Sequence, residues 1–271
     1  MTLPTFVVVG AMRSGTSSLA RWLRPHPEVF LALPKELHFF DEQYDRGTDW
    51  YRRRFADVDG ERAVGEATPS YLYRGEAVER MAALLPDARL IAILRDPIER
   101  AYSHYWLERI RGREQRSFED AVTAELGPHP VRETPGSMTY LAWGRYLPQL
   151  ERLGRLYPRP AVLALLFDDL TASPTTTYAH VCRFLDVDDR FVPPTLGAAV
   201  NASIAFRSLA VRRLSKRLPA PARRVVDHFN VRPFRYPPVD PGLRKHLVDH
   251  MADDNRALAT WLDRDLSAWM R

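Results

Sequence analysis

The feature that most constrains the fold is a turn near the start of the chain. An apolar run at residues 6–9 leads into Gly10, four further residues and Gly15, and the sequence TSSLARWLR that follows predicts a helix. A buried strand, a glycine-containing turn and a helix in immediate succession place backbone N–H groups and the positive end of a helix dipole at one point. This arrangement suits a phosphate group and belongs to an α/β fold.

The turn departs at one position from the pattern G-x-x-x-x-G-K-[ST] of nucleoside triphosphatases. Thr16 stands where those enzymes have the lysine that reaches the β- and γ-phosphates, and Ser17 follows it. Arg13 supplies a cation from inside the turn, and Ser18 adds another hydroxyl. We therefore predict a loop for a single phosphate. The alternative is a Gly-Ser-Thr turn that leads into a helix and binds nothing.

Short apolar runs alternate with helical patterns along the chain. Strands are predicted at residues 5–10, 63–66, 88–96 and 161–167, and helices at 16–24, 76–85, 97–111, 140–157, 174–185 and 241–261. Residues 127–136 read as a loop, and the proline-rich residues 186–240 as irregular chain that folds over the sheet. This alternation predicts an α/β, P-loop-like three-layer fold, with a central parallel sheet flanked by helices, in a single domain of residues 1–271.

Composition narrows the class of protein. The chain has 271 residues, 45% of them hydrophobic, which is enough for one large core. No apolar run approaches the ~18 residues of a membrane span, and no basic leader precedes the first one, so we expect a cytoplasmic protein. The single cysteine, Cys182, lies among apolar helix residues and is predicted to pack in the core. No His/Cys cluster has zinc-ligand spacing, so no metal is expected.

Positive charge is concentrated late in the chain. The formal net charge is +5, and between residues 207 and 235 the only acidic residue is Asp227. The basic residues of that segment are Arg207, Arg212, Arg213, Lys216, Arg217, Arg223, Arg224, Arg232 and Arg235. An acidic partner is one interpretation, and a solvated basic helix face is the other.

A second anion site is predicted where the third apolar run ends. Arg95 lies at the carboxyl end of this strand, where open α/β sheets bind ligands. Asp96, Pro97 and Glu99 form the capping pattern of a helix, and Ser103 lies nearly two turns along that helix. We predict that Arg95 and Ser103 hold a second phosphate. The alternatives are an ion pair of Arg95 with its acidic neighbours and a plain helix-surface serine.

Six motifs in order resemble the sulfotransferases that use 3′-phosphoadenosine 5′-phosphosulfate (PAPS), especially the heparan sulfate glucosaminyl sulfotransferase group. They are GAMRSGTSSL, KELHFFD, GTDWY, GEATPSYL, LIAILRDPIERAYSHYW and LFDDLTASP, with a weaker match at VRPFRYPPVD. The resemblance runs from Phe6 to about Leu185. It implies a single α/β domain, a reaction without metal, and a donor with a 5′-phosphosulfate and a 3′-phosphate. Such a donor has no γ-phosphate, so the loop needs no lysine after Gly15.

The resemblance also implies roles for individual residues. The positions that match the family's 5′-phosphosulfate loop are Arg13, Ser14, Gly15, Thr16, Ser17 and Ser18. Arg95 and Ser103 match its 3′-phosphate ligands. Arg232 and Arg235 match loosely the basic positions of a late cofactor loop, which a disulfide braces in several relatives and for which no second cysteine exists here.

Two departures from the family pattern affect the chemistry. Relatives usually have lysine where this chain has Arg13, which can stabilise the departing phosphate oxygen but is no proton donor at neutral pH. Ala67 replaces a lysine that is frequent in glycosaminoglycan enzymes. This second difference weakens any transfer of their acceptor specificity to this chain.

The catalytic base is predicted in KELHFFD. Sulfuryl transfer requires that the acceptor lose a proton as it attacks, and a carboxylate or imidazole within hydrogen-bond reach can take it. Glu36 matches the family's glutamate base. His38 is the alternative, either as the base, as in the small-molecule branch of the superfamily, or as a hydrogen-bonded core residue. If neither acts, another acceptor-facing segment is required, such as the one that carries Glu66.

The function predicted from the sequence is transfer of a sulfuryl group from PAPS to a hydroxyl, or an amine, on a carbohydrate, glycolipid or glycosylated metabolite. The diphosphate PAP leaves, and no metal or nucleic acid takes part. If the acceptor is attached to a lipid, peripheral contact of the protein with a membrane is a further alternative. Two other classes compete: a magnesium-dependent P-loop kinase with Asp96 as metal ligand, and a polyanion-binding protein that uses the basic segment alone.

Overall fold

The computed structural model describes residues 2–127, 138–198, 204–215 and 217–271. Its centre is a five-stranded parallel sheet with the strand order β2-β3-β1-β4-β5. The strands are β1 (Phe6–Gly10), β2 (Val29–Leu31), β3 (Ala63–Ala67), β4 (Arg89–Leu94) and β5 (Val162–Leu166). Their carboxyl ends therefore lie along the same edge of the sheet.

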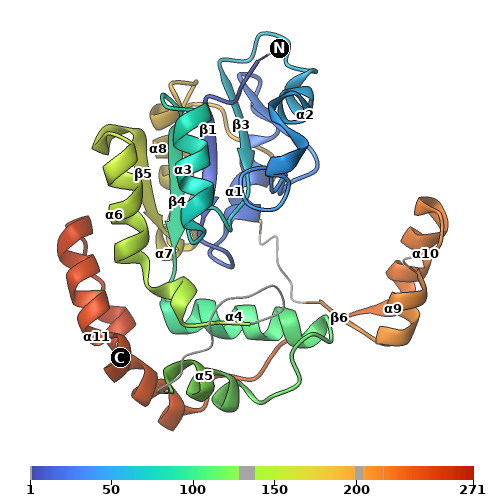
Figure 1. The fold of residues 1–271 in the computed structure, drawn as a ribbon, viewed down its shortest axis with the longest axis vertical. Helices are drawn as coiled ribbons and strands as arrows, with labels where there is room; N and C mark the ends of the chain where they lie inside the picture. The colour runs from blue at the N-terminus through green and yellow to red at the C-terminus, as the bar shows by residue number, and fades with distance from the viewer. Residues whose placement is uncertain (1, 128–137, 199–203, 216) are drawn as a thin grey trace.

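Alternate residues of the central strands pack on opposite faces of the sheet. Val7 and Val9 lie in one apolar cluster, with residues of α3 (Gly75–Leu84), α6 (Tyr146–Leu156) and α11 (Pro241–Leu262). Phe6 and Val8 lie in a second cluster, with α1 (Thr16–Leu23) and α8 (Pro174–Leu185). Figure 1 shows the helices on the two sides of the sheet. The predicted α/β fold, with a parallel sheet between helix layers, is confirmed.

A third apolar cluster lies beyond the carboxyl edge of the sheet. It joins α4 (Pro97–Ile110), α5 (Phe118–Leu126) and the first half of α11. Asp96 begins α4 as predicted, since its Oδ1 accepts hydrogen bonds from the N–H groups of Ile98 at 2.8 Å and Glu99 at 3.2 Å. The predicted helix that ends near Leu185 is α8, and Cys182 in it is fully buried, as expected.

The helix predicted at residues 140–157 is wrong in its first part. Its α-helical portion begins at Tyr146, after a short 3-10 turn at Ala142–Gly144. The cause is Glu125, whose carboxylate accepts hydrogen bonds from the backbone N–H groups of residues 140, 141 and 142 at 2.6 to 2.9 Å. All but the first residue of the loop predicted at 127–136 lies outside the described residues.

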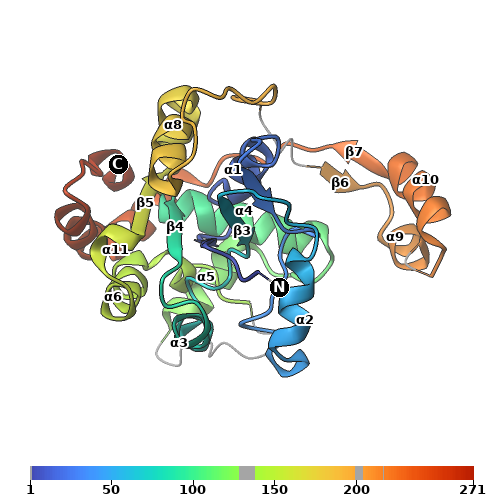
Figure 2. The ribbon, with the colours of Figure 1, turned by 90° about the horizontal axis from the view of Figure 1, so that it is seen from above.

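The prediction that residues 186–240 form irregular chain over the sheet is also wrong. This segment contains α9 (Leu209–Ser215), α10 (Ala220–Asn230) and an antiparallel ribbon of β6 (Ile204–Phe206) and β7 (Val231–Pro233). Figures 1 and 2 both show α9 and α10 well to one side of the sheet. The prolines were taken as breakers of regular structure, but Pro219 directly precedes α10, a position that tolerates proline.

Several short elements of the fold were not predicted from the sequence. Strand β2 has three residues, and the remaining helices are α2 (Thr48–Arg52), α5 and α7 (Phe167–Ala172). Within the described part of the chain, no helix is both long enough and apolar enough to cross a membrane.

Candidate active site

Two glycines shape the turn that follows β1. A Cβ at Gly10 would lie 2.7 Å from the Cβ of Leu72, so only glycine fits there. Gly15 has φ +99°, and a Cβ on it would lie 3.0 Å from the ring of Phe167. Gly15 is also the N-cap of α1, and no side chain caps this helix. The first N–H groups of an uncapped helix, together with its dipole, form a site for an anion.

The hydroxyl side chains of this turn differ in accessibility. Ser14 is fully buried and Thr16 is 4% exposed, so solvent hardly reaches either side chain. Ser17 and Ser18 are half-buried, as is Arg13. A ligand at the N-terminus of α1 is therefore more accessible to the hydroxyls of Ser17 and Ser18 than to the hydroxyl of Ser14.

Arg13 joins the two predicted phosphate sites. Its Nε donates a hydrogen bond to Ser103 Oγ at 3.0 Å, although 90 residues separate the two in sequence. Arg95 Nη1 donates to the carbonyl oxygen of Arg13 at 3.3 Å. The turn after β1, the end of β4 and the second turn of α4 therefore meet at one point.

Arg95 also forms an ion pair with an acidic neighbour, which was the alternative to its binding a phosphate. Its Nη2 lies 3.6 Å from Glu99 Oε2, and its guanidinium lies 4.9 Å from the ring centroid of Phe167. The second acidic neighbour, Asp96, has other partners: its Oδ1 caps α4, and its Oδ2 accepts a hydrogen bond from Arg244 Nη2 at 2.8 Å. Both oxygens of Asp96 are therefore occupied within the fold.

The KELHFFD segment is a loop attached to the carboxyl end of β3. The N–H of Glu36 donates to the carbonyl of Ala67 at 3.1 Å, and the N–H of His38 donates to Thr68 Oγ1 at 3.4 Å. Five described residues other than glycine have positive φ, and two of these, Asp186 and Asp263, end helices α8 and α11.

The other three left-handed residues are Arg13 at φ 72°, Glu36 at φ 67° and His38 at φ 52°. A side chain in this conformation is strained, and such strain is concentrated at functional sites in proteins. These three positions are also the ones that sequence reasoning selected for the chemistry.

Glu36 lies between two cations. Lys35 Nζ is 2.8 Å from its Oε1, and His38 Nε2 is 3.6 Å from its Oε2. The contact with His38 and the charge of Lys35 lower the pKa of Glu36 to about 2, against the opposing effect of burial. Its side chain is still 41% exposed. Glu36 is therefore an accessible carboxylate that stays ionised throughout the neutral pH range.

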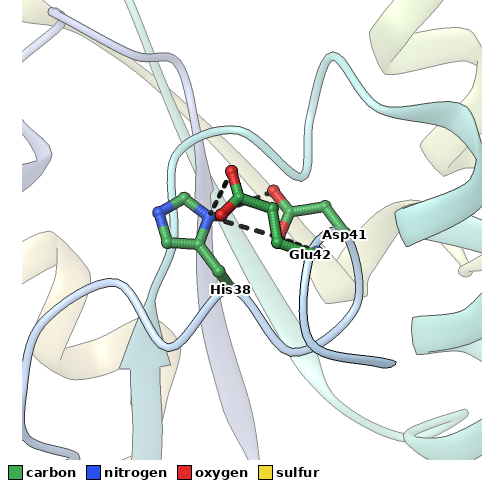
Figure 3. Close-up of side chains that lie close together, drawn as sticks. All are labelled: His38, Asp41 and Glu42. Carbon is green, nitrogen blue, oxygen red and sulfur yellow. Dashed lines mark hydrogen bonds and ion pairs between the residues drawn. The ribbon is translucent and has the colours of Figure 1, made fainter. Parts of the chain in front are cut away.

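His38 has carboxylates near both ring nitrogens, and Figure 3 shows two of them, Asp41 and Glu42, near Nδ1. Its Nδ1 is 3.2 Å from both oxygens of Asp41 and 3.8 Å from Glu42 Oε1. Asp41, and after it Glu36, raise the pKa of His38 to about 10. The ring is therefore an imidazolium at neutral pH. Ligand atoms of His38, Asp41 and Glu42 lie within 4.8 Å of one another, but a metal ion could bind at this cluster only by displacing the proton of His38.

Glu66, the fallback base, is buried. It is 1% exposed and accepts hydrogen bonds from Thr68 Oγ1 at 2.7 Å, Tyr51 Oη at 2.8 Å and Tyr71 Oη at 3.2 Å. Burial raises its pKa to about 6. These three hydroxyls hold the Glu66 carboxylate inside the fold, away from solvent.

A cleft of about 1150 Å³ opens beside these residues. Glu36 and His38 line it, together with Met12, which precedes Arg13, and His104, which follows Ser103. The arginines that line it are Arg74, Arg80, Arg111, Arg113, Arg145 and Arg152. Its acidic lining residues are Glu36, Asp41, Glu42, Glu76 and Glu108. The cleft therefore runs from the predicted base to residues next to the predicted phosphate sites, and charges of both signs line it.

His104 is a residue of this cleft that sequence reasoning missed. It is 7% exposed, and its ring packs edge-on against Tyr140 and Trp143. Burial holds its pKa well below its usual range, and Arg100 and Arg13 lower it further. Its position directly after Ser103 was the only indication in the sequence. The cleft arginines gave none, because they come from separate segments.

Arg232 and Arg235, the remaining predicted cofactor residues, are exposed. Arg232 lies on β7, and Arg235 stands between Phe234 and Tyr236, whose rings pack on Trp106 of α4 at 5.2 and 6.0 Å between centroids. This segment therefore lies against the helix that carries Ser103.

Comparison with protein families gives a match to the model described as the sulfotransferase family, over residues 51–191. The matched range includes Arg95 and Ser103, whereas the turn after β1 and Glu36 lie before it. A crystal structure of a sulfotransferase from Alicyclobacillus acidocaldarius is 30% identical, with a TM-score of 0.77 and full coverage of both chains.

Two curated proteins are also similar. Heparan sulfate glucosamine 3-O-sulfotransferase 3B1 of Homo sapiens is 33% identical over 68% of this chain and 46% of its own length. The membrane-associated sulfotransferase kil1 of Dictyostelium discoideum is 35% identical over 46% of this chain and 28% of its own length. The chain thus matches less than half of the length of these two relatives.

Proposed function

The chain belongs to the sulfotransferase family, and on this premise we propose that it transfers a sulfuryl group from PAPS to a carbohydrate, glycolipid or glycosylated metabolite. Residues 1–271 form one sulfotransferase domain in this proposal. The observation that carries it is the hydrogen bond between Arg13 and Ser103, which brings together two segments that resemble the family's two phosphate sites. A cytoplasmic location stays a prediction.

The donor residues of the proposal lie at the carboxyl edge of β1 and β4. The uncapped start of α1, with Ser17 and Ser18, receives the 5′-phosphosulfate, and Arg13 stabilises the phosphate that leaves. Arg95 and Ser103 receive the 3′-phosphate. Because Arg13 Nε now donates to Ser103, binding of the donor exchanges this hydrogen bond for bonds to phosphate oxygens.

The acceptor lies in the cleft, with its reacting hydroxyl or amine at Glu36. As the acceptor oxygen or nitrogen forms its bond to sulfur, its proton passes to the Glu36 carboxylate, and the bond between sulfur and the 5′-phosphate oxygen breaks. The bound donor supplies the activated sulfuryl group. His38, already protonated, orients Glu36 and does not take the proton itself.

Six arginines and five acidic residues line the cleft, and three of the arginines pair with Glu76 or Glu108. Arg152, which donates to the carbonyl of Tyr73 at 3.4 Å, is a cation that a sulfate or carboxylate group of an acceptor could meet. A relative named for heparan sulfate glucosamine supports a glycan that carries sulfate or carboxylate groups. Acidic glycans should therefore be better acceptors than neutral ones of the same length, with an advantage that decreases as salt is added.

The kinase alternative is less well supported. It needs Asp96 as a magnesium ligand, but the two oxygens of Asp96 cap α4 and bind Arg244. The polyanion-binding alternative explains the basic segment but leaves the cleft and the strained residues Arg13, Glu36 and His38 without a role.

Calorimetry separates these functions. The ligands are 3′,5′-diphosphoadenosine (PAP), ATP and a duplex oligonucleotide, each with and without a chelator. We expect tight binding of PAP alone, unchanged by the chelator. Binding of ATP that depends on magnesium would contradict the proposal, as would binding of the oligonucleotide in preference to PAP.

A further inference from the structure

Residues 204–235 form an extension, here called the basic arm, whose two helices have no part in the proposed reaction, although Arg232 and Arg235 at its end are predicted cofactor residues. It consists of β6, α9, α10 and β7, and Figures 1 and 2 show its helices away from the rest of the molecule. From residue 207 to residue 235 it has nine Lys and Arg residues and one acidic residue, whereas the rest of the chain has 30 Lys and Arg against 33 Asp and Glu. The net positive charge of the protein thus resides in the arm.

Polar contacts hold the two helices of the arm together. Asp227 of α10 pairs with Arg212 of α9 and accepts a hydrogen bond from Ser215 Oγ at 2.7 Å. Asn230 Nδ2 donates to the carbonyl of Ser208 at 2.9 Å, and the N–H of Ser208 donates to Asn230 Oδ1 at 2.9 Å. The arm's one acidic residue is therefore used inside it.

Large apolar side chains are exposed on the arm. Their exposed fractions are 41% for Val211, 62% for Leu214, 37% for Leu218, 59% for Val225 and 73% for Phe229. Asp227 faces α9, and residues two positions away on a helix point about 200° around it, so Val225 and Phe229 point away from α9. Val211 and Leu214, three residues apart, share one side of α9.

We propose that the basic arm docks on an anionic lipid bilayer. Its exposed apolar side chains enter the boundary between headgroups and acyl chains, and its arginines lie at the lipid phosphates, as in other basic amphipathic helices at membrane surfaces. Two copies of so basic an arm would repel each other. A nucleic acid would attract the arginines but would leave Leu214 and Val225 in water.

Docking would also orient the cleft. The segment after β7 packs on α4 through the ring of Tyr236, whose centroid is 5.4 Å from that of Tyr102. Helix α4 carries Ser103 and His104, which lie at the donor site and in the cleft. The arm therefore fixes the side of the cleft that approaches the membrane. This inference does not depend on the sulfotransferase activity.

The test is sedimentation of the full chain with vesicles of phosphatidylcholine, with and without phosphatidylglycerol. We expect binding only to vesicles with the anionic lipid, and weaker binding as salt rises. The double variant Leu214→Gln/Val225→Gln keeps the charge and should bind these vesicles about 10- to 100-fold more weakly, because it loses two buried apolar side chains. The variant Arg217→Glu/Arg223→Glu should abolish binding.

Matched controls exclude general effects of surface polarity. Leu156 and Val192 are 42% and 62% exposed and lie outside the arm, so Leu156→Gln/Val192→Gln should bind vesicles like the parent protein. Equal losses for the two double variants would overturn the proposal. It would also be overturned by equal binding to neutral vesicles, by preference for a duplex oligonucleotide over anionic vesicles, or by a dimer that the arm variant dissociates.

Discussion

The proposed donor site and the proposed acceptor site are built in different ways. On the donor side, Arg95 and Ser103 lie at the end of a strand and within a helix, and Ser103 is 3% exposed. On the acceptor side, Glu36 and His38 stand in a loop and depend on neighbouring charges for their protonation states. In the proposed reaction, regular secondary structure therefore positions the donor residues, whereas neighbouring charges set the protonation states of the acceptor loop.

The largest expected effect comes from the acceptor side. Glu36→Gln keeps the size of the side chain but removes its ability to accept a proton, so kcat should decrease by ~10²- to 10⁴-fold. The affinity for PAP should stay unchanged, because the donor residues lie on other segments. Steady-state assays and calorimetry on the same preparation measure the two quantities.

Glu42→Gln is the matched control for this change. Glu42 lines the same cleft and also lies near His38, at 3.8 Å, but its side chain is 66% exposed and is not assigned to the reaction. It should retain nearly the full kcat. Comparable losses in the two variants would mean that the charge of the loop, and not Glu36 as base, sets the rate.

A smaller effect is expected on the donor side. Arg95→Ala should weaken PAP binding by ~1.5 to 3 kcal/mol, the scale of a charge-assisted hydrogen bond, which is about 10- to 150-fold in Kd. Adenosine 5′-monophosphate lacks the 3′-phosphate and should bind the variant and the parent equally. Glu99→Gln removes the ion pair but keeps Arg95, so it should bind PAP at least as well as the parent. If the variant lost affinity equally for both nucleotides, Arg95 would stabilise the fold and would not bind the 3′-phosphate.

The smallest effect concerns His38 and pH. A raised pKa means that the protonated ring stabilises the folded state below its ordinary pKa of about 6.5, and that this stabilisation disappears as the pH rises through about 10. The pH–rate profile of the parent should therefore show no inflection near pH 6.5. His38→Asn should lower kcat only a few-fold, and its profile should show no inflection there either. A parent profile with an inflection there, absent from the variant, would make His38 the base.

Much of the fold was predictable because its strands are apolar runs and its helices carry caps. The strands β1, β4 and β5 fit this description, β3 was predicted although it contains Gly65 and Glu66, and β2 has only three residues and gave no pattern. The start of α6 was misplaced because Glu125, distant in sequence, binds the backbone N–H groups before it. The basic arm was misread because its helices are short and lie in proline-rich sequence.

The parts of the candidate site that one continuous segment forms could be predicted from the sequence. Two such parts are the turn after β1 and the start of the helix at Asp96. The hydrogen bond from Arg13 to Ser103 was not predictable, because it joins residues assigned to different phosphates. The charged lining of the cleft arises where separate segments meet, and no local pattern in the sequence predicts it.

The most direct test of the account is transfer of a labelled sulfuryl group from PAPS to a sulfated glycosaminoglycan, with and without a chelator. The account predicts label on the glycan in both conditions with the parent and with Glu42→Gln, and very little label with Glu36→Gln. Labelled ATP should give no transfer. Label on the glycan that appears only when magnesium is present would contradict the account. So would phosphoryl transfer from ATP, if PAPS gave no sulfuryl transfer to either acidic or neutral glycans.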